Sequence, residues 1–293
     1  TLAPRATRSR GRRTLAYVGL SVAAAVVGLL FLLPLWWTFV NSLRPGAETF
    51  SYLNPLQWQT FFTLSPTLDN YLSLLNSDLG RAIANSLFVS VTTVVIGLVI
   101  CATAAFGLSA IPFRGRGALF SIVILSFLIP FDAISIPLAN LFRDWDLQNT
   151  FTGLILPGIG NGMAIFLLRT FFLAIPGELV EAGRLDGLGW WGIFRRIAMP
   201  LMMPVLAAIT IFTFTFNWGY LFGPLIYINT ESKMPLALGI QILSATSSGA
   251  QTPPWNMVMV GALILIVPMV AVYHFGQKYL YETGLVSGSV GLK

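Results

Sequence analysis

Cysteine and histidine are almost absent from this 293-residue chain, which contains one of each, Cys101 and His274. A single cysteine cannot form a disulfide within the chain, and it says nothing about the redox compartment. A transition-metal site is not expected either, because such sites need a cluster of Cys or His ligands. No pair of nucleophile and base stands out in the apolar segments. We therefore predict no catalytic residues and no metal ligands.

Charged residues are scarce as well. They make up 10% of the chain, compared with about 25% in soluble proteins. Hydrophobic residues make up 56% and the mean hydropathy is +0.78. This composition predicts an integral membrane protein. The net charge of +6 does not indicate a nucleic acid partner, because the basic residues are distributed around the apolar segments.

Six apolar stretches reach the length of about 20 residues that a helix needs to cross a bilayer. They cover residues 15–40, 84–111, 118–141, 152–175, 200–226 and 256–276. The first is longer than the roughly 7–15 apolar residues of a signal peptide and lacks a small-residue cleavage site, so we expect it to be retained. Without an internal repeat, we predict one six-helix domain at 15–280, a basic tail at 1–14 and a C-terminal tail at 281–293.

Basic residues predict the orientation. With the amino terminus inside, 13 of the 17 Lys and Arg residues lie on the inner side of the membrane. The outer side keeps Arg44, Arg81, Arg143 and Lys233. The excess of inner positive charge predicts that both termini are cytoplasmic in an all-α, multi-pass protein of the cell membrane. The outer segments 49–76 and 230–256 either dock a partner or pack on the bilayer surface.

The longest predicted cytoplasmic loop carries the sequence ELVEAGRLDG at 178–187, with four charged residues in ten. Pro176 and Gly177 are typical of a helix start, and Glu178 suits the positive end of the helix dipole. Gly187 interrupts this helix, and apolar residues then recur at helical spacing from Trp190. Two short helices joined by a glycine predict a compact knob at 176–200. The alternative is a solvated loop with an amphipathic turn.

The stretch EAGRLDGLGWWGIFRRIAMP resembles the cytoplasmic signature of bacterial ABC importer permeases: E-A-A, three residues, G, nine residues, I, one residue, L-P. The matching positions are Glu181, Ala182, Gly187, Ile197 and Pro200, while Gly183 replaces the second Ala and Met199 the Leu. The flank RTFFLAIPGELVEAGRLDG is similar to the second, MalG-like permease of the maltose and glycerol-3-phosphate type. LDNYLSLL, FNWGYLFGPL and GLVSGSV support this resemblance over residues 69–293.

The resemblance implies a type I ABC importer permease fold and a permease subunit that forms half of the translocation path of an ATP-driven sugar importer. The implied partners are a second, different permease, a dimer of ATP-binding subunits and an extracytoplasmic solute-binding protein. The knob is then the coupling element, through Glu178, Glu181, Ala182, Gly183, Asp186, Gly187 and Pro200. ATP and Mg belong to the partner, because no lysine here follows the glycine of a phosphate-binding loop.

Polar residues within the spans predict a substrate path. Placing a charged Asp132 at the centre of a membrane helix costs about 2.5–3.5 kcal/mol of insertion free energy. This cost indicates that Asp132 faces the interior of the bundle or a water-filled cavity. Asp132, Asn161 and Asn217 each lie about nine residues, roughly 13 Å, from the outer end of a span. Thr213, Asn217 and Tyr220 share one helix face, flanked by Trp218. Such amide, carboxylate and aromatic groups suit a weak carbohydrate site. Alternatively, they bond to neighbouring helices.

The main rival function is a secondary transporter of a small polar solute, driven by protons or sodium. Such a protein needs paired ionisable residues across several spans, whereas Asp132 is nearly alone. The hypothesis of a secondary transporter also leaves the knob without a function. The transported compound is predicted only as a disaccharide, an oligosaccharide or a phosphorylated polyol.

Overall fold

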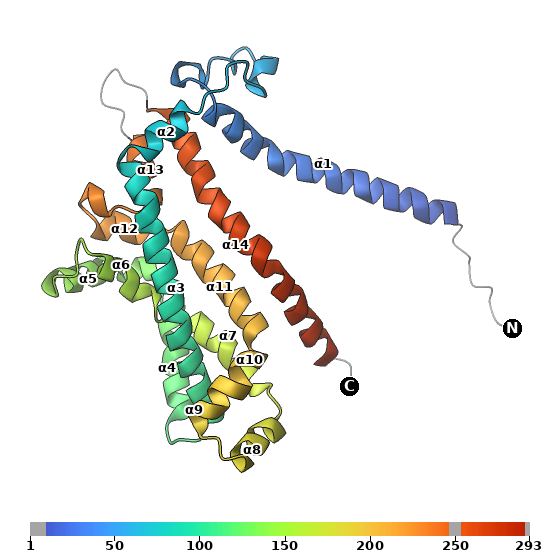
Figure 1. The fold of residues 1–293 in the computed structure, drawn as a ribbon, viewed down its shortest axis with the longest axis vertical. Helices are drawn as coiled ribbons and strands as arrows, with labels where there is room; N and C mark the ends of the chain where they lie inside the picture. The colour runs from blue at the N-terminus through green and yellow to red at the C-terminus, as the bar shows by residue number, and fades with distance from the viewer. Residues whose placement is uncertain (1–9, 246–252, 291–293) are drawn as a thin grey trace. The chain divides into compact units, whose positions relative to one another are not determined.

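The computed structural model describes residues 10–245 and 253–290, without the side chains of 10–16, Ala47, Asp132 and 280–290. Within these ranges the regular structure is entirely helical (Figure 1). The α-helices are α1 Arg10–Ser42, α2 Asp69–Leu75, α3 Asp78–Ala110, α4 Arg116–Leu128, α5 Phe131–Asp144, α6 Phe151–Ile155, α7 Gly162–Leu173, α8 Gly177–Leu185, α9 Trp190–Ile193, α10 Met199–Leu201, α11 Met203–Trp218, α12 Phe222–Tyr227, α13 Leu236–Ala245 and α14 Trp255–Val290. The 3₁₀ turns are Gly46–Glu48, Trp58–Thr60, Leu156–Gly158 and Glu231–Lys233, and a π-helix covers Phe194–Ala198.

Four segments of the described chain are long and apolar enough to cross a membrane by themselves. They are Tyr17–Ser42, Asp78–Ala110, Phe151–Leu173 and Trp255–Tyr279. Two bent helix pairs, α4 with α5 and Trp190–Leu201 with α11, bring the number to six if each pair is one span. The prediction of a multi-pass helical protein is therefore confirmed. Four of the six predicted spans correspond to these segments, although the fourth is broken at residues 159–161, and the third and fifth are bent helix pairs.

The interruptions have local causes. Ile129 is extended, with ψ of 119°, because the residue before a proline avoids the helical region. Pro130 therefore ends α4, and α5 leaves at 102°. The predicted span 118–141 is thus two helices rather than one. The predicted span 200–226 is also shorter, since α11 ends at Trp218 and α12 begins at Phe222.

A helix that the sequence did not predict, α13, lies within the predicted outer segment 230–256. It packs on the beginning of α3, where Leu236 and Leu238 are buried. The side chain of Asn85 donates to the carbonyls of Ser232 and Met234, at 3.0 Å each. The N–H of Leu236 donates to Ser86 Oγ at 2.8 Å. Part of this segment is therefore folded onto the chain.

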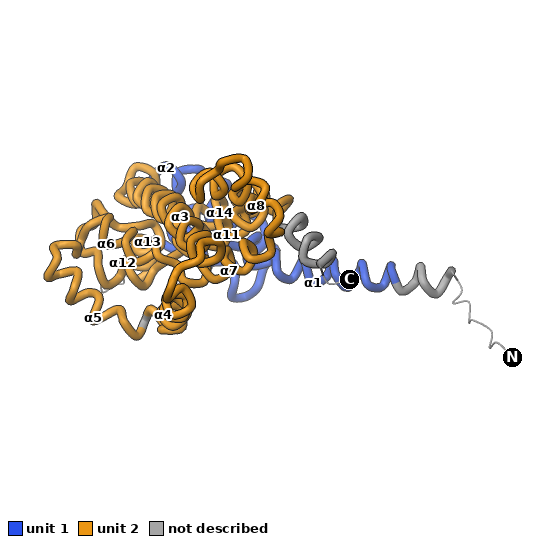
Figure 2. Tube along the Cα trace, turned by 90° about the horizontal axis from the view of Figure 1, so that it is seen from below, with its two compact units in different colours: residues 1–73, 254–263 blue, residues 74–253, 264–293 orange. Residues whose placement is uncertain are grey.

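The chain divides into two compact units, coloured separately in Figure 2. Unit 1 comprises residues 1–73 and 254–263 and contains α1. Beyond α1, the buried side chain of Arg44 donates to Asn41 Oδ1 at 3.2 Å and to the Phe62 carbonyl at 3.0 Å. Asn70 Nδ2 donates to the Arg44 carbonyl, and Asn256 Nδ2 donates to Asn70 Oδ1, both at 2.7 Å. These hydrogen bonds attach the predicted outer segment 49–76, at Phe62 and Asn70, to the residues that follow α1.

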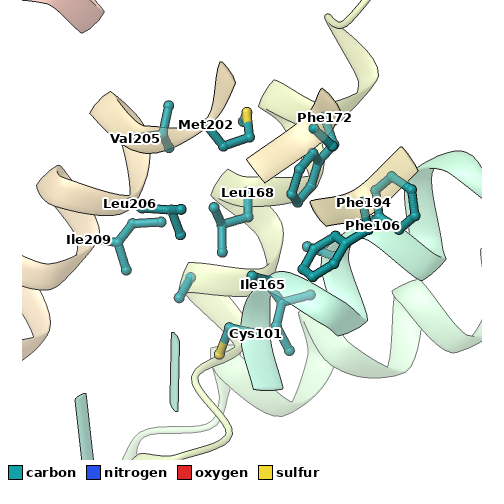
Figure 3. Packing of buried hydrophobic residues seen from close by; sticks show 14 of the residues in the cluster. Cys101, Phe106, Ile165, Leu168, Phe172, Phe194, Met202, Val205, Leu206 and Ile209 are labelled. Carbon is teal, nitrogen blue, oxygen red and sulfur yellow. The ribbon is translucent and has the colours of Figure 1, made fainter. Parts of the chain in front are cut away.

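Unit 2 comprises residues 74–253 and 264–293, and its largest core lies where α3, α7, α11 and the segment around Phe194 meet (Figure 3). Phe106 of α3 packs against Phe172 of α7 and against Phe194, with ring centroids 5.6 and 5.1 Å apart. Leu168 and Met202 are buried beside them. This core joins the 176–200 segment to three membrane helices, so the segment is built into the bundle.

Candidate functional site: the 176–200 knob and the polar ends of the helices

The backbone of the 176–200 segment has the predicted form of two short helices around a glycine turn. Pro176 precedes α8, and Gly187 follows it with φ of +81°, a conformation that side chains with a Cβ rarely adopt. The N–H of Leu188 donates to the Gly183 carbonyl at 2.9 Å and closes the turn. The second half runs through α9, the π-helix and α10, and bends by 76° into α11. The knob is thus continuous with a membrane helix.

The inner side of this knob is packed. Ile193 is 1% exposed and Phe194 is 7% exposed, both within the core of unit 2. Gly183 is buried, and a Cβ placed on it would lie 2.6 Å from Ile197 Cδ1. An alanine at this position would therefore require the end of the Ile197 side chain to shift. Gly183 therefore packs the two halves of the knob together, while Pro200 begins the turn into α11.

The outer side of the knob is charged and open. Glu178, Glu181 and Asp186 are exposed and form no ion pair within the part of the chain that the structure describes. Ala182, within α8, is exposed between Glu181 and Asp186. Leu185 is 89% exposed. Carboxylates without partners next to a solvent-facing leucine make a surface that fits another protein.

Leu185 was not singled out from the sequence, although its position gave a signal. It lies two residues after the buried Gly183, about 200° around the helix, so it faces the opposite side of α8. Arg184 itself lies over the Trp190 ring, with its guanidinium carbon 4.9 Å from the ring centre. The Arg184 guanidinium therefore connects the two halves of the knob. The carboxylates of Glu178, Glu181 and Asp186 stay available for contacts with another protein.

Asn161, Thr213 and Asn217 meet at one small void of about 10 Å³, to which α3 contributes Thr93. Their side chains make local hydrogen bonds there. Asn161 Oδ1 accepts the Ala164 N–H at 3.0 Å and caps α7, and Asn217 Nδ2 donates to the Thr213 carbonyl at 2.8 Å. The break before α7 confirms that the PGIGNG stretch is not a continuous helix. In this conformation the void is too small for a sugar.

A second cavity, of about 110 Å³, lies on the other side of Asn217. Its walls are aromatic: Tyr220 stacks with Phe216 at 5.2 Å and meets Phe131 edge-on at 6.0 Å. Tyr227 also lines it, and the Tyr227 hydroxyl is buried with no hydrogen-bond partner among the side chains that the structure describes. Tyr227 was not predicted from the sequence, although it stands seven residues after Tyr220 near the end of a predicted span. Aromatic faces around an amide are the groups expected at a carbohydrate site.

Trp218 does not join these residues. It is 2% exposed, stacks on Phe214 at 5.8 Å and donates from Nε1 to the Leu265 carbonyl at 2.9 Å. Trp218 therefore faces the packed interior, away from Asn217, because adjacent residues of a helix point in different directions. The side chain of Asp132 lies outside those that the structure describes. Its backbone is in the first turn of α5, next to Phe131.

Comparison with known proteins identifies the family. The family described as "Binding-protein-dependent transport system inner membrane component" matches residues 93–282. The arabinooligosaccharides transport system permease protein AraQ of Halalkalibacterium halodurans is 31% identical, over 92% of this chain and 95% of its own length. The sn-glycerol-3-phosphate transport system permease protein UgpE of Rhizobium meliloti is also 31% identical, over 89% and 93%.

A solved structure shares the fold. The crystal structure of a bacterial ABC transporter that imports the acidic polysaccharide alginate contains a chain with a TM-score of 0.79 and 24% identity. The match covers 94% of this chain and 99% of that one. The family model matches more than half of the chain, and two relatives are above 30% identical to it. The helical structure, with several apolar segments of membrane length, agrees with both findings. The chain belongs to the family of binding-protein-dependent transport system inner membrane components, the permease subunits of ABC importers.

Proposed function

We propose that this permease is the MalG-like subunit of an importer for an oligosaccharide or a related polyol. Relatives named for arabinooligosaccharides, for sn-glycerol-3-phosphate and for trehalose support a carbohydrate, since each aligns over most of this chain. The aromatic cavity beside Asn217 agrees with that class of substrate. We also propose six spans with both termini in the cytoplasm, and tails at 1–14 and 281–293. Residues 1–9 and 291–293 lie outside the described chain.

In this proposal the knob couples the membrane helices to ATP-binding subunits. One observation carries the assignment: a packed inner side and an open, charged outer side occur on the same short segment. Glu178, Glu181 and Asp186 provide charge complementarity, and Leu185 provides apolar contact with the partner. Pro200, Gly187 and Gly183 shape the knob, and Ala182 lets the partner approach closely.

The packing of the knob on the membrane helices also explains how its movement would reach them. When ATP closes the partner dimer, the knob moves as a rigid body, because its inner side is part of a close-packed core. Phe194 then carries Phe106 of α3 and Phe172 of α7 with it. The bend at Met202 passes the same displacement to α11. ATP and Mg bind to the partner, and this chain changes the access of the substrate path.

For the substrate path we propose the face of α11 that holds Thr213, Asn217 and Tyr220, together with Asn161, Asp132 and Tyr227. The cavity beside Asn217 would hold a sugar ring only after it widens, since about 110 Å³ is below the roughly 300 Å³ of small ligand sites. The buried Tyr227 hydroxyl is a hydrogen-bond donor that a sugar hydroxyl can satisfy.

Reconstitution tests the proposal. Vesicles containing this chain, a second permease, the ATP-binding subunits and a solute-binding protein should accumulate an oligosaccharide or polyol only with ATP. Glu181→Lys should abolish uptake but leave this chain folded in the membrane, because Glu181 makes no ion pair inside the described chain. Ser121→Ala, at an exposed residue of α4 outside the knob, is a control. Uptake by this chain alone under a proton or sodium gradient would show that it is a secondary transporter.

A further inference from the structure

An apolar groove lies beside the knob, within unit 2. Its volume is about 690 Å³, in the range of about 300–1,000 Å³ typical of small-molecule sites. Four elements form its walls: α3, the second half of the knob, α11 and α14. Leu98, Ile211 and Val272 line the end far from the knob. The other residues that line it include neither Asp nor Glu within the described chain.

The knob end of this groove is positively charged. Arg195 lines the groove, is exposed, and has no ion-pair partner among the side chains that the structure describes. Lys278 adds a second cation, since its Nζ lies 4.8 Å from the centre of the Tyr279 ring, which also lines the groove. Trp191, 67% exposed, lies at the same end. The groove therefore combines a long apolar wall with two cations and two aromatic rings at one mouth.

We propose that the groove binds one anionic phospholipid. Its acyl chains lie along α3, α11 and α14, and its phosphate faces Arg195 and Lys278. An apolar wall favours hydrocarbon, while basic pockets between membrane helices on the cytoplasmic side bind anionic headgroups. Trp191 and Tyr279 suit the headgroup level, where such rings concentrate. The assignment to the inner leaflet rests on the proposed orientation, whereas the choice of lipid rests on the lining residues.

A lipid in this groove also supports the knob. Phe194 connects the groove to the core, because it lines the groove and also packs on Phe106 in the core of unit 2. Trp191 and Met199 contact the groove from the same part of the knob. The bound lipid therefore fills the space between the knob and α14, and its loss would leave the second half of the knob less firmly packed on the bundle.

The test uses the complete importer in vesicles of phosphatidylcholine, with or without one part in five of phosphatidylglycerol. Brominated forms of each lipid quench tryptophan fluorescence on contact, and the difference between the native protein and W191F isolates the signal of Trp191. Phosphatidylglycerol should quench Trp191 at lower mole fraction than phosphatidylcholine. Arg195→Gln and Lys278→Gln should each lower this preference about fivefold, or about 1 kcal/mol per basic residue.

Arg114→Gln is the matched control, since it removes one exposed charge that does not line the groove. An unchanged lipid preference in the double variant Arg195→Gln/Lys278→Gln would overturn the proposal. So would efficient cross-linking of Phe275→Cys, 74% exposed in the groove wall, to the second permease, because a protein helix would then fill the groove. ATP-driven uptake in the same vesicles is scored separately, so a failure of the lipid site is distinguishable from a failure of the proposed transport function.

Discussion

Replacement of Gly187 gives the sharpest test of the shape of the knob. Gly187 has φ of +81°, and a Cβ added there meets nothing within 4 Å. A substitution therefore creates no clash with neighbouring residues, and its cost comes from the backbone. For residues with a Cβ, the left-handed conformation costs about 1–2 kcal/mol. That is a factor of roughly 5–30 in the fraction of knobs that keep the bent conformation.

Gly189 is the matched control. It is two residues away in the same turn, it also has open space around it, and its φ of −72° is accessible to any residue. Gly187→Val should therefore reduce ATP-driven uptake several-fold, whereas Gly189→Val should leave it near the native value. Gly187→Asn should retain more activity than Gly187→Val, because Asn tolerates the left-handed region and β-branched residues do not.

Uptake into vesicles and ATP hydrolysis are measured on the same preparations. Gly187→Val should lower the hydrolysis stimulated by the solute-binding protein by a similar factor, because fewer knobs keep the bent conformation that fits the ATP-binding subunit. Equal effects of valine at positions 187 and 189 would refute the reasoning, since the variants differ mainly in backbone conformation. Equal activity of Gly187→Asn and Gly187→Val would refute it as well.

Three further changes test other parts of the structure. Phe194→Ala should lower stability by about 3–5 kcal/mol, measured as thermal unfolding in detergent, because the ring is 7% exposed between Phe106 and its neighbours. Tyr227→Phe should leave thermal stability unchanged or slightly higher, since it removes a buried hydroxyl that has no partner within the described part of the chain. The KM for uptake should rise about two- to tenfold, for one lost hydrogen bond to the substrate. Arg44→Leu should lower stability by about 1–3 kcal/mol for each acceptor left without a donor, including the Phe62 carbonyl, as seen by protease resistance of unit 1.

Each of these changes has a control. Trp191→Ala, at a side chain that is 67% exposed, should destabilise the protein less than Phe194→Ala. Equal losses would mean that Phe194 is not part of a packed core. A native KM in Tyr227→Phe would remove Tyr227 from the substrate path. Native protease resistance in Arg44→Leu would show that the hydrogen bonds of Arg44 do not hold the segment that follows α1.

Much of this fold follows from composition and periodicity. Long apolar runs predict α1, α3 and α14, because each is a continuous stretch longer than a bilayer crossing. The interrupted helices were harder to predict. Pro130 and Gly219 lie inside apolar runs, and hydropathy alone gives no sign that the chain turns there. The helix α13 was missed because ten apolar residues are too few to cross a membrane.

The local form of the knob was predictable, whereas the arrangement of the residues proposed for the substrate path was not. The charged run, Pro176 and Gly187 specify a local structure, and local structure can be read from neighbouring residues. The path depends on which faces of separate helices meet. Sequence spacing placed Trp218 beside Asn217, but the bundle turns Trp218 toward Leu265 and exposes Asn217 to a cavity that also contains Tyr227. Only the packing of several helices decides between these orientations.

Site-specific cross-linking tests the central claim, that the 176–200 knob docks on the ATP-binding subunit. The native cysteine, Cys101, is buried and can be replaced, so Leu185→Cys introduces a single exposed thiol at the tip of the knob. Leu64→Cys, 76% exposed in the predicted outer segment, is the control. The account predicts that a short thiol-to-amine reagent joins position 185, and not position 64, to the ATP-binding subunit, with a yield that changes when ATP is added. No cross-link from position 185, or equal cross-links from both positions, would contradict it.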